Sequence, residues 1–378
     1  MKVFSNARIF TPDFRFADGW FAVADGRFAA VGYGECPYND ATDLACATVL
    51  PGLIDVHNHG NSNADFSDGD IGGLRRMAAY LGKSGVTSFA PASMTLPYET
   101  LSAAFKTAVQ LRGERPAGSS KILGIHMEGP FFSEKKKGAQ NAAYLRLPDA
   151  GAVKRLAADA DGLLRIVDVA PELEGAIDFV RAVSKDCTVS IAHTDASYDD
   201  ARAAIDAGAT HLTHLFNAMP SIHHRKPGVI AAGAESPKVR AEIICDGIHV
   251  HPASIRLAFA LFGASRMVLI SDALRCCGMP DGEYELGGQA VYLRGKTCTL
   301  ADGTLAGSVT NLFDCMRNAV AFGIPAEAAI RAASYNPACQ LGVEDRVGSI
   351  AAGLDADFLF CDSALMLRAV YIDGEKVE

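Results

Sequence analysis

The feature that most constrains the fold is a regular alternation of short apolar runs with helical patterns through the middle of the chain. The apolar runs, each typical of a buried strand, are GLIDVH, VTSFAP, KILGIHMEG, LLRIVDVAP, TVSIAHT, ATHLTHLF, AEIICDGIHV and RMVLISDA. Helical segments between them include GGLRRMAAYLGKSG, ETLSAAFKTAVQLRG, ELEGAIDFVRAVSKD, SYDDARAAIDAG and PASIRLAFALFG. Such alternation implies parallel strands with right-handed crossovers. Eight runs predict an α/β fold with a closed (β/α)8 barrel of the TIM type. An open doubly wound sheet is the alternative, but no Gly-x-Gly-x-x-Gly follows the first run.

The two ends of the chain have a different pattern, made of short strand-like runs. Residues 1–51 contain several such runs, and Asp25-Gly26 predicts a hairpin turn between two of them. The last segment holds two more runs, the second broken at Asp373-Gly374. Neither end has enough strands to form a stable sheet alone. We therefore expect residues 1–51 and 346–378 to pair into a small β-sandwich domain, with residues 52–345 forming the barrel.

Composition limits the classes of function. The chain has 378 residues, of which 49% are hydrophobic, and a formal net charge of −9 without a clustered basic face, which argues against nucleic-acid binding. Its ten cysteines form no CxxC pair and are interpreted as reduced thiols. The first residues lack a signal-peptide pattern, and no apolar stretch has the length of a membrane span. We expect a soluble cytoplasmic protein whose partners include neither nucleic acid nor a membrane.

Polar residues collect where the predicted strands end. His57 and His59 are two positions apart, so on a strand they share a face. Catalytic groups of such barrels lie at the carboxyl ends of the strands, where this chain places His57, His59, Glu128, His193, His214, His249 and Asp272. Imidazole and carboxylate together suit zinc, iron, manganese or cobalt. This pattern predicts a catalytic metal site. The alternative for any single residue is a hydrogen-bonded core side chain or, for Asp272, a helix N-cap.

Several motifs then carry a family resemblance. PGLIDVHNHG resembles the first-strand signature of the amidohydrolase superfamily. The order of HMEGPFFSEKKKGAQN, AHTDAS, THLFNAMPSIHHRKPG, DGIHVHP, SDALRCCGMPDGEY and DGTLAGS is similar to that of the N-acetylglucosamine-6-phosphate deacetylase family, over nearly the whole chain. The resemblance implies metal-dependent hydrolysis of the acetamide of N-acetyl-D-glucosamine 6-phosphate in amino-sugar catabolism. The products would be D-glucosamine 6-phosphate and acetate.

The resemblance also implies roles for individual residues. Glu128, His193 and His214 match the ligands of the principal metal, and His57 and His59 match the positions that hold a second metal in some members. We therefore expect one or two divalent ions per subunit, zinc or iron before manganese or cobalt. Asp272 matches the catalytic aspartate, which would accept a proton from the attacking water and deliver it to the departing amine. His126, on the same strand as Glu128, is expected to support the ligands rather than bind the metal.

Other positions match substrate contacts of the family. They are Ala139, Gln140, Asn217, Ala218, Arg225, His249, Leu305, Ala306 and Gly307. Arg225 matches the arginine that binds the phosphate, in a loop that can serve the neighbouring subunit, so we expect a homodimer. Judged without the resemblance, this loop is an ordinary solvated basic turn. Gln140 is a departure, because some relatives carry histidine there, and it leaves the pose of the sugar open.

Two other functions are consistent with these observations. One is a different amidohydrolase reaction, on an unphosphorylated N-acetyl sugar or a cyclic amide. The other is a catalytically silent barrel that only binds a ligand. The complete set of predicted metal ligands argues against the silent barrel.

Overall fold

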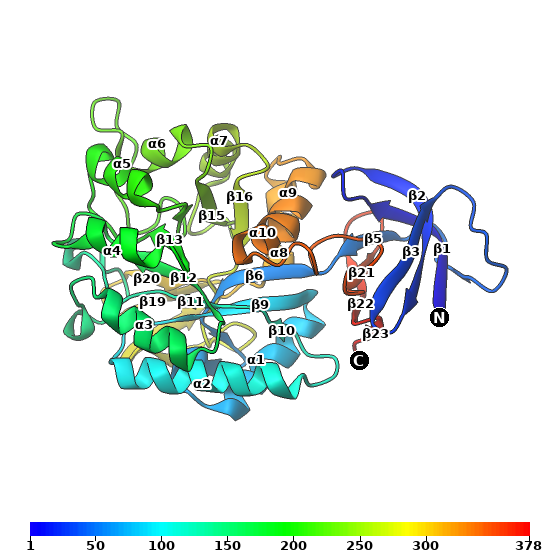
Figure 1. The fold of residues 1–378 in the computed structure, drawn as a ribbon, viewed down its shortest axis with the longest axis horizontal. Helices are drawn as coiled ribbons and strands as arrows, with labels where there is room; N and C mark the ends of the chain where they lie inside the picture. The colour runs from blue at the N-terminus through cyan, green and yellow to red at the C-terminus, as the bar shows by residue number, and fades with distance from the viewer.

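The computed structural model describes residues 1–378 and contains the expected barrel, shown with its helices on the left of Figure 1. Its parallel strands follow chain order: β6 (Leu53–Asn58), β9 (Val86–Ser93), β11 (Ile125–Met127), β12 (Leu164–Val169), β13 (Thr188–Ile191), β14 (His211–Leu212), β15 (Arg240–Ile244) and β16 (Met267–Ile270). The ring nearly closes between β16 and β6, where the Asp272 N–H donates to the His57 carbonyl at 2.9 Å. This order confirms the eight predicted strands and rules out the doubly wound sheet. The third strand is interrupted, because β10 (Lys121–Ile122) pairs with the start of β9 and β11 pairs with its end.

Helices cover the outside of the barrel and the end where its strands begin. They are α1 (Ile71–Lys83), α2 (Tyr98–Glu114), α3 (Ala150–Asp159), α4 (Ala176–Val183), α5 (Tyr198–Ala207), α6 (Gly228–Glu235), α7 (Pro252–Phe262), α8 (Leu312–Ala321), α9 (Ala326–Ala333) and α10 (Tyr335–Leu341). Several begin at capping residues: the Asp70 side chain accepts from two backbone N–H groups of α1, and Ser197 and Asp200 form a capping box on α5. None of the helices combines the length and the apolarity that a membrane crossing requires.

The barrel interior is apolar on the side where the strands begin. Side chains from the strands meet side chains of α10 and the turn after it there, in one buried cluster: Ile54, Val56, Ala90, Leu123, Ile166, Ile244, Val268, Ile270, Ala338, Leu341, Val343 and Val347. This half of the interior is therefore filled. Polar groups and any ligand are left to the other half, where the strands end.

The two ends of the chain form the predicted β domain, on the right of Figure 1. Its sheet has the order β23 (Glu375–Lys376), β22 (Leu367–Ile372), β21 (Phe358–Cys361), β5 (Thr48–Pro51), β1 (Lys2–Phe10), β2 (Phe16–Ala24) and β3 (Arg27–Tyr33), with β4 (Thr42–Asp43) beside β1. The rings of Phe28 on β3 and Phe358 on β21 have centroids 5.7 Å apart, although three strands separate them in the sheet. One curled sheet therefore supplies both faces of the domain. The boundaries at 51/52 and 345/346 stay a prediction, which the end of β5 at Pro51 supports.

A buried lysine joins the barrel to the β domain. Lys121, at the start of β10, lies 2.6 Å from a carboxylate oxygen of Asp357, 3.0 Å from Asp373 and 3.1 Å from Asp355. The three acids flank strands β21 and β22 of the β domain, and the Lys121 side chain is only 8% exposed. Asp355 and Asp373 also contact Arg346 and Arg115, but Lys121 is the only cation paired with the buried Asp357 carboxylate. Removing the lysine would leave that buried charge without a counter-charge, which is far more costly than losing an exposed pair.

Lys121→Ala is therefore expected to lower the free energy of unfolding by about 3–5 kcal/mol. The matched control is Lys2→Ala, which removes the pair between Lys2 and Glu375, whose side chains are 50% and 77% exposed, and should cost about 1 kcal/mol or less. Urea unfolding followed by circular dichroism measures both. Equal losses for the two variants would contradict this account of the domain junction.

One element was not predicted. A four-stranded antiparallel sheet follows β16, made of β17 (Gly282–Leu286), β18 (Gln289–Arg294), β19 (Thr297–Thr299) and β20 (Leu305–Gly307). Its last strand leads to Ser308, whose N–H donates to the Asp272 carbonyl at 2.8 Å. The sheet thus brings residues 305–307 to the carboxyl end of β16. The remaining short elements are β7 (Gly60–Asn61), β8 (Ala64–Asp65) and 3-10 turns at Phe66–Asp68, Glu134–Lys136 and Ala142–Tyr144.

Candidate active site

A cavity of about 310 Å³ opens at the carboxyl ends of the barrel strands. Its wall contains nearly every residue predicted for the site: His59, Glu128, Ala139, Gln140, His193, His214, Asn217, Ala218, His249, Asp272, Leu305, Ala306 and Gly307. His57 lies directly behind His59 and is fully buried. Arg225 is the one predicted residue that the structure places elsewhere.

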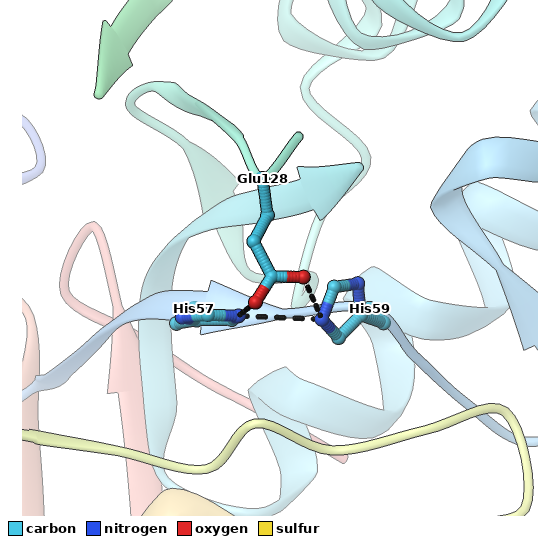
Figure 2. Close-up of side chains that lie close together, drawn as sticks. All are labelled: His57, His59 and Glu128. Carbon is cyan, nitrogen blue, oxygen red and sulfur yellow. Dashed lines mark hydrogen bonds and ion pairs between the residues drawn. The ribbon is translucent and has the colours of Figure 1, made fainter. Parts of the chain in front are cut away.

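Glu128 lies between two pairs of histidines. On one side, its Oε1 is 3.2 Å from His193 Nε2 and 3.1 Å from His214 Nε2. On the other side, shown in Figure 2, its two oxygens are 3.5 Å from His57 Nε2 and 3.3 Å from His59 Nε2. The two Nε2 atoms are 3.1 Å apart in the first pair and 3.2 Å apart in the second. One carboxylate therefore faces two groups of ligand atoms, in the arrangement expected for one or two ions.

The backbone turns three of these side chains into the cavity. His193, His214 and Asp272 each lie two residues beyond the last residue of a strand, after β13, β14 and β16. All three adopt positive φ, of 43°, 32° and 49°. This left-handed conformation costs a residue with a side chain roughly 1–2 kcal/mol. Backbone strain of this kind is characteristic of functional sites, and here it directs three polar side chains to one point.

The hydrogen bonds of the rings test whether the group fits a metal. The Nδ1 atom of His59 lies 3.1 Å from the Ala92 carbonyl oxygen, and that of His193 lies 2.9 Å from the Lys136 carbonyl oxygen. His57 Nδ1 lies 3.0 Å from Glu242 Oε2. Carbonyl and carboxylate oxygens accept hydrogen bonds, so each Nδ1 carries the proton and each Nε2 presents a lone pair. Lone pairs and a carboxylate gathered this closely repel one another unless a cation lies among them, so these residues fit divalent ions.

The ionisation of the group leads to the same conclusion. Burial by itself would raise the pKa of Glu128, but His57, His193 and His214 hold it well below its ordinary value. Burial would lower the pKa of His214, but Glu128 and Asp272 raise it to about 9. The carboxylates are therefore negative at neutral pH and require positive charge beside them, which a protonated His214 supplies when no ion is bound and which a divalent ion supplies when it takes the place of that proton.

Asp272 stands between the second pair of histidines and the cavity. Its Oδ1 is 3.4 Å from His59 Nε2 and 3.6 Å from His57 Nε2. Burial alone would raise the pKa of this carboxyl group, but His57 and His59 lower it below its usual value. The Asp272 carboxylate is therefore ionised and able to accept a proton from a molecule bound in the cavity.

The hydrogen bonds of two residues in the cavity wall show which of their polar atoms are free to contact a ligand. His249 Nδ1 lies 2.7 Å from Asp246 Oδ2, which leaves Nε2 without a protein partner at the wall of the cavity. Gln140 is held at both ends of its amide: one N–H donates to Glu128 Oε2 at 2.6 Å, and the amide oxygen accepts from the Thr95 N–H at 2.8 Å. His249 is thus free to contact a ligand, whereas Gln140 orients the Glu128 carboxylate.

Arg225 lies away from these residues. It is exposed, its guanidinium contacts His224 Nε2 at 2.6 Å, and it lines a separate depression together with Asp195 and Tyr198. The cationic side chains that line the cavity itself are Lys135 and Lys136, which sequence reasoning did not select. Their signal was present, since the run 135–137 directly precedes the Gly-Ala-Gln-Asn segment at 138–141, which contains the predicted substrate contacts Ala139 and Gln140.

A polar network lies below the ligands, and only His126 of its members was predicted. His126 Nδ1 lies 3.0 Å from the Val56 carbonyl oxygen and its Nε2 lies 2.9 Å from Asp168 Oδ1. Both ring nitrogens face acceptors, so His126 is an imidazolium paired with Asp168. Burial would lower the pKa of His126, but the Asp168 carboxylate raises it to about 9. His126 therefore has no lone pair for a metal, in line with the supporting role expected of it. Glu242, which lies 3.7 Å from His126 Nδ1 and contacts His57, is the third member of this network.

A parallel barrel with this histidine and carboxylate set at its carboxyl end defines the class of protein. Residues 48–377 match the amidohydrolase family, and the chain belongs to that family. Within it, the chain is 37% identical over 353 residues to the N-acetylglucosamine-6-phosphate deacetylase of Bacillus subtilis, a match that covers 92% of this chain and 89% of that protein. The chain therefore groups with the N-acetylglucosamine-6-phosphate deacetylases, as its motifs implied.

Two further comparisons refine this grouping. An N-acetylgalactosamine-6-phosphate deacetylase of Escherichia coli is 35% identical over 370 residues, covering 97% of both chains. A mutant N-acetyl-D-glucosamine-6-phosphate deacetylase of Mycobacterium smegmatis, solved in complex with N-acetyl-D-glucosamine-6-phosphate, is 35% identical with a TM-score of 0.93. That match covers 100% of this chain and 99% of the other. The relatives thus include two epimeric substrates, both phosphorylated.

Proposed function

We propose that this chain hydrolyses the acetamide of N-acetyl-D-glucosamine 6-phosphate to D-glucosamine 6-phosphate and acetate, in amino-sugar catabolism. The observation that carries the proposal is the cavity in which Asp272 and the ligands Glu128, His193, His214 and His59 face one space. The names of the relatives in Bacillus subtilis and Mycobacterium smegmatis agree with this substrate.

Each step of the reaction has a group suited to it. When bound, a divalent ion polarises the acetamide carbonyl and makes a water molecule acidic enough to attack it near neutral pH. Asp272 accepts the proton that this water loses as its oxygen bonds to the carbonyl carbon. The same carboxyl group then delivers that proton to the sugar nitrogen as the C–N bond breaks, so the amine leaves neutral and the carboxylate is regenerated. His249 Nε2, Asn217 and residues 305–307 are in position to hold the sugar.

The phosphate requires cations at the outer end of the cavity. Lys135 and Lys136 supply them within one subunit. Arg225 is exposed and outside the cavity of its own chain, so we propose that it completes the phosphate site of a second copy in a homodimer, where its planar fork suits the phosphate oxygens.

The ions and the location are proposed on the same basis. Glu128 facing two histidine pairs supports two divalent ions per subunit, with zinc or iron favoured and manganese or cobalt as alternatives. All ten cysteines are free thiols, four of them intermediate or exposed (Cys36, Cys46, Cys187 and Cys339), which supports a reducing cytoplasm.

The purified protein supplied with zinc is expected to release acetate from N-acetylglucosamine 6-phosphate, and chelator-treated protein to release little. Acetate is measured by a coupled assay in parallel reactions with N-acetylgalactosamine 6-phosphate and with unphosphorylated N-acetylglucosamine. A preference for the galactose epimer would change the assigned sugar. Equal rates with and without the phosphate would favour the alternative amidohydrolase reaction, and no release from any of them would favour a silent barrel.

A further inference from the structure

Glu242 is a buried carboxylate that the proposed reaction does not use. It lies on β15 in the barrel interior, below the ligand groups, with an exposed fraction of 0%. Its Oε2 is 3.0 Å from His57 Nδ1 and accepts from the backbone N–H of His214 at 3.2 Å. Its Oε1 is 3.0 Å from His211 Nε2. Glu242 therefore touches one residue from each of the two ligand groups.

The contact with His57 decides which ring nitrogen can bind an ion. Glu242 accepts the Nδ1 proton, so the lone pair of His57 must be on Nε2, which faces His59 and Glu128. Two of the other ligand rings donate to neutral carbonyl groups, of Ala92 for His59 and of Lys136 for His193, and His214 Nδ1 has no hydrogen-bond partner. Only His57 is backed by a carboxylate, which orients the ring and increases its basicity as a ligand.

The charges around Glu242 point to the same role. His126 Nδ1 lies 3.7 Å from Glu242 Oε1, but the His126 imidazolium is paired more closely with the Asp168 carboxylate, at 2.9 Å, so that pair is neutral as a whole. Glu242 forms no ion pair with lysine or arginine, and its partners are imidazoles and a backbone N–H. Its negative charge therefore adds to those of Glu128 and Asp272. One divalent ion leaves this buried group of three carboxylates negative, and a second ion offsets the excess.

We propose that Glu242 is a positioning residue that fixes His57 as a ligand and thereby sets the affinity of the His57–His59 position for a second divalent ion. This inference rests on the two-ion centre of the proposed function. It assigns Glu242 no contact with the substrate.

The test is zinc binding to the metal-free protein, measured by calorimetric titration and by elemental analysis after dialysis. Glu242→Gln keeps the size of the side chain and removes its charge. We expect wild type to bind two ions and the variant to bind the second about 10–100-fold more weakly, since loss of a group supporting a ligand has effects of this size. The first ion, held through His193 and His214, is expected to change by about threefold or less.

Two further variants separate positioning from a structural role. Asp357→Asn removes a buried carboxylate that pairs with Lys121 at the junction with the β domain instead of contacting a ligand ring, and it should leave both zinc affinities unchanged. Glu242→Asp retains the charge, so it provides a folded variant if Gln is not tolerated. Its carboxylate is shorter by one methylene and no longer reaches His57, so it should also weaken the second ion.

The outcomes distinguish this inference from the proposed function. If wild type binds two ions and both Glu242 variants bind them equally well while unfolding at lower temperature, Glu242 is a structural residue and the inference is overturned alone. If wild type binds fewer than two ions, the two-ion centre fails and the inference fails with it. In a His57→Gln background the Glu242→Gln change should have no further effect, because Glu242 acts through His57.

Discussion

Asp272→Asn is expected to lower kcat for acetate release by about 10³-fold or more, because general acid–base catalysis by one side chain contributes roughly 10²–10⁴-fold and Asp272 is assigned both proton transfers. The amide of asparagine has nearly the same shape as the carboxylate but cannot accept a proton from water at neutral pH. Its oxygen still faces His59 and His57, from which Asp272 Oδ1 lies 3.4 and 3.6 Å, so zinc content should be retained. Steady-state kinetics and elemental analysis measure the two quantities.

The control for this prediction is Asp302→Asn. Asp302 is an exposed acid on the turn before β20, near the same rim, and its variant should keep kcat within about twofold, since a surface substitution of this kind rarely matters. Turnover of Asp272→Asn within a few-fold of wild type would remove Asp272 from the proton-transfer steps. If Asp272→Asn loses both turnover and zinc, Asp272 is a metal ligand and its role as a base is not supported.

The barrel could be predicted from the sequence because the same pattern, an apolar strand followed by a helix, recurs along the chain. Each buried parallel strand has an apolar run that ends in a polar residue, and periodic helices separate the runs, so one misread run would not change the fold. The four-stranded sheet of residues 282–307 has no such redundancy. Its strands are three to six residues long and partly exposed, so none of them has an apolar run long enough to stand out from a loop in the sequence. The interruption of the third strand around Gly124 gave no signal either, because its apolar run continues across the break.

The wall of the candidate site was predictable to a similar degree. His193, His214 and Asp272 follow their strands at the same distance, so strand assignment alone brings them to one end of the barrel. Glu242 could not be selected in this way, because it lies inside a strand and its role depends on a contact with a residue 185 positions away. The engagement of Gln140 by Glu128 was equally hidden, since sequence does not tell which of two nearby polar groups a side chain meets.

For Arg225, the sequence could not show which subunit's site the side chain serves, because a subunit interface leaves no periodic pattern in a sequence. Its side chain is exposed and lies in a depression separate from the cavity, so within one chain it has no part in the site. The motif predicts that Arg225 binds the phosphate of the substrate, whereas the structure places it outside the cavity of its own chain. Both hold only if the arginine of one subunit binds the phosphate in the cavity of another. That condition makes the proposed homodimer testable through activity as well as through mass.

Arg225→Ala is expected to raise KM for N-acetylglucosamine 6-phosphate about 30-fold or more, since removing one partner of a charge-assisted contact costs about 2–5 kcal/mol. It should leave kcat and the KM for unphosphorylated N-acetylglucosamine nearly unchanged. Arg181→Ala, an exposed arginine on α4 that pairs with Asp178, is the control and should change neither substrate's KM. Equal effects of Arg225→Ala on the two sugars would mean that the arginine does not bind the phosphate.

Mixing subunits then decides where Arg225 acts. A dimer of one Asp272→Asn chain and one Arg225→Ala chain has one intact site if Arg225 serves the partner, because the second chain keeps Asp272 and receives Arg225 from the first. If Arg225 serves its own chain, both sites of that dimer are defective. Random exchange makes about half of the dimers mixed, each with one of two sites intact, so about a quarter of wild-type activity should return at subsaturating substrate. At that concentration each homodimer keeps about 3% of wild-type activity or less, because a rise in KM of about 30-fold lowers kcat/KM by the same factor. Recovery well above this level measures the shared site directly, and its absence would place Arg225 outside the partner's phosphate site.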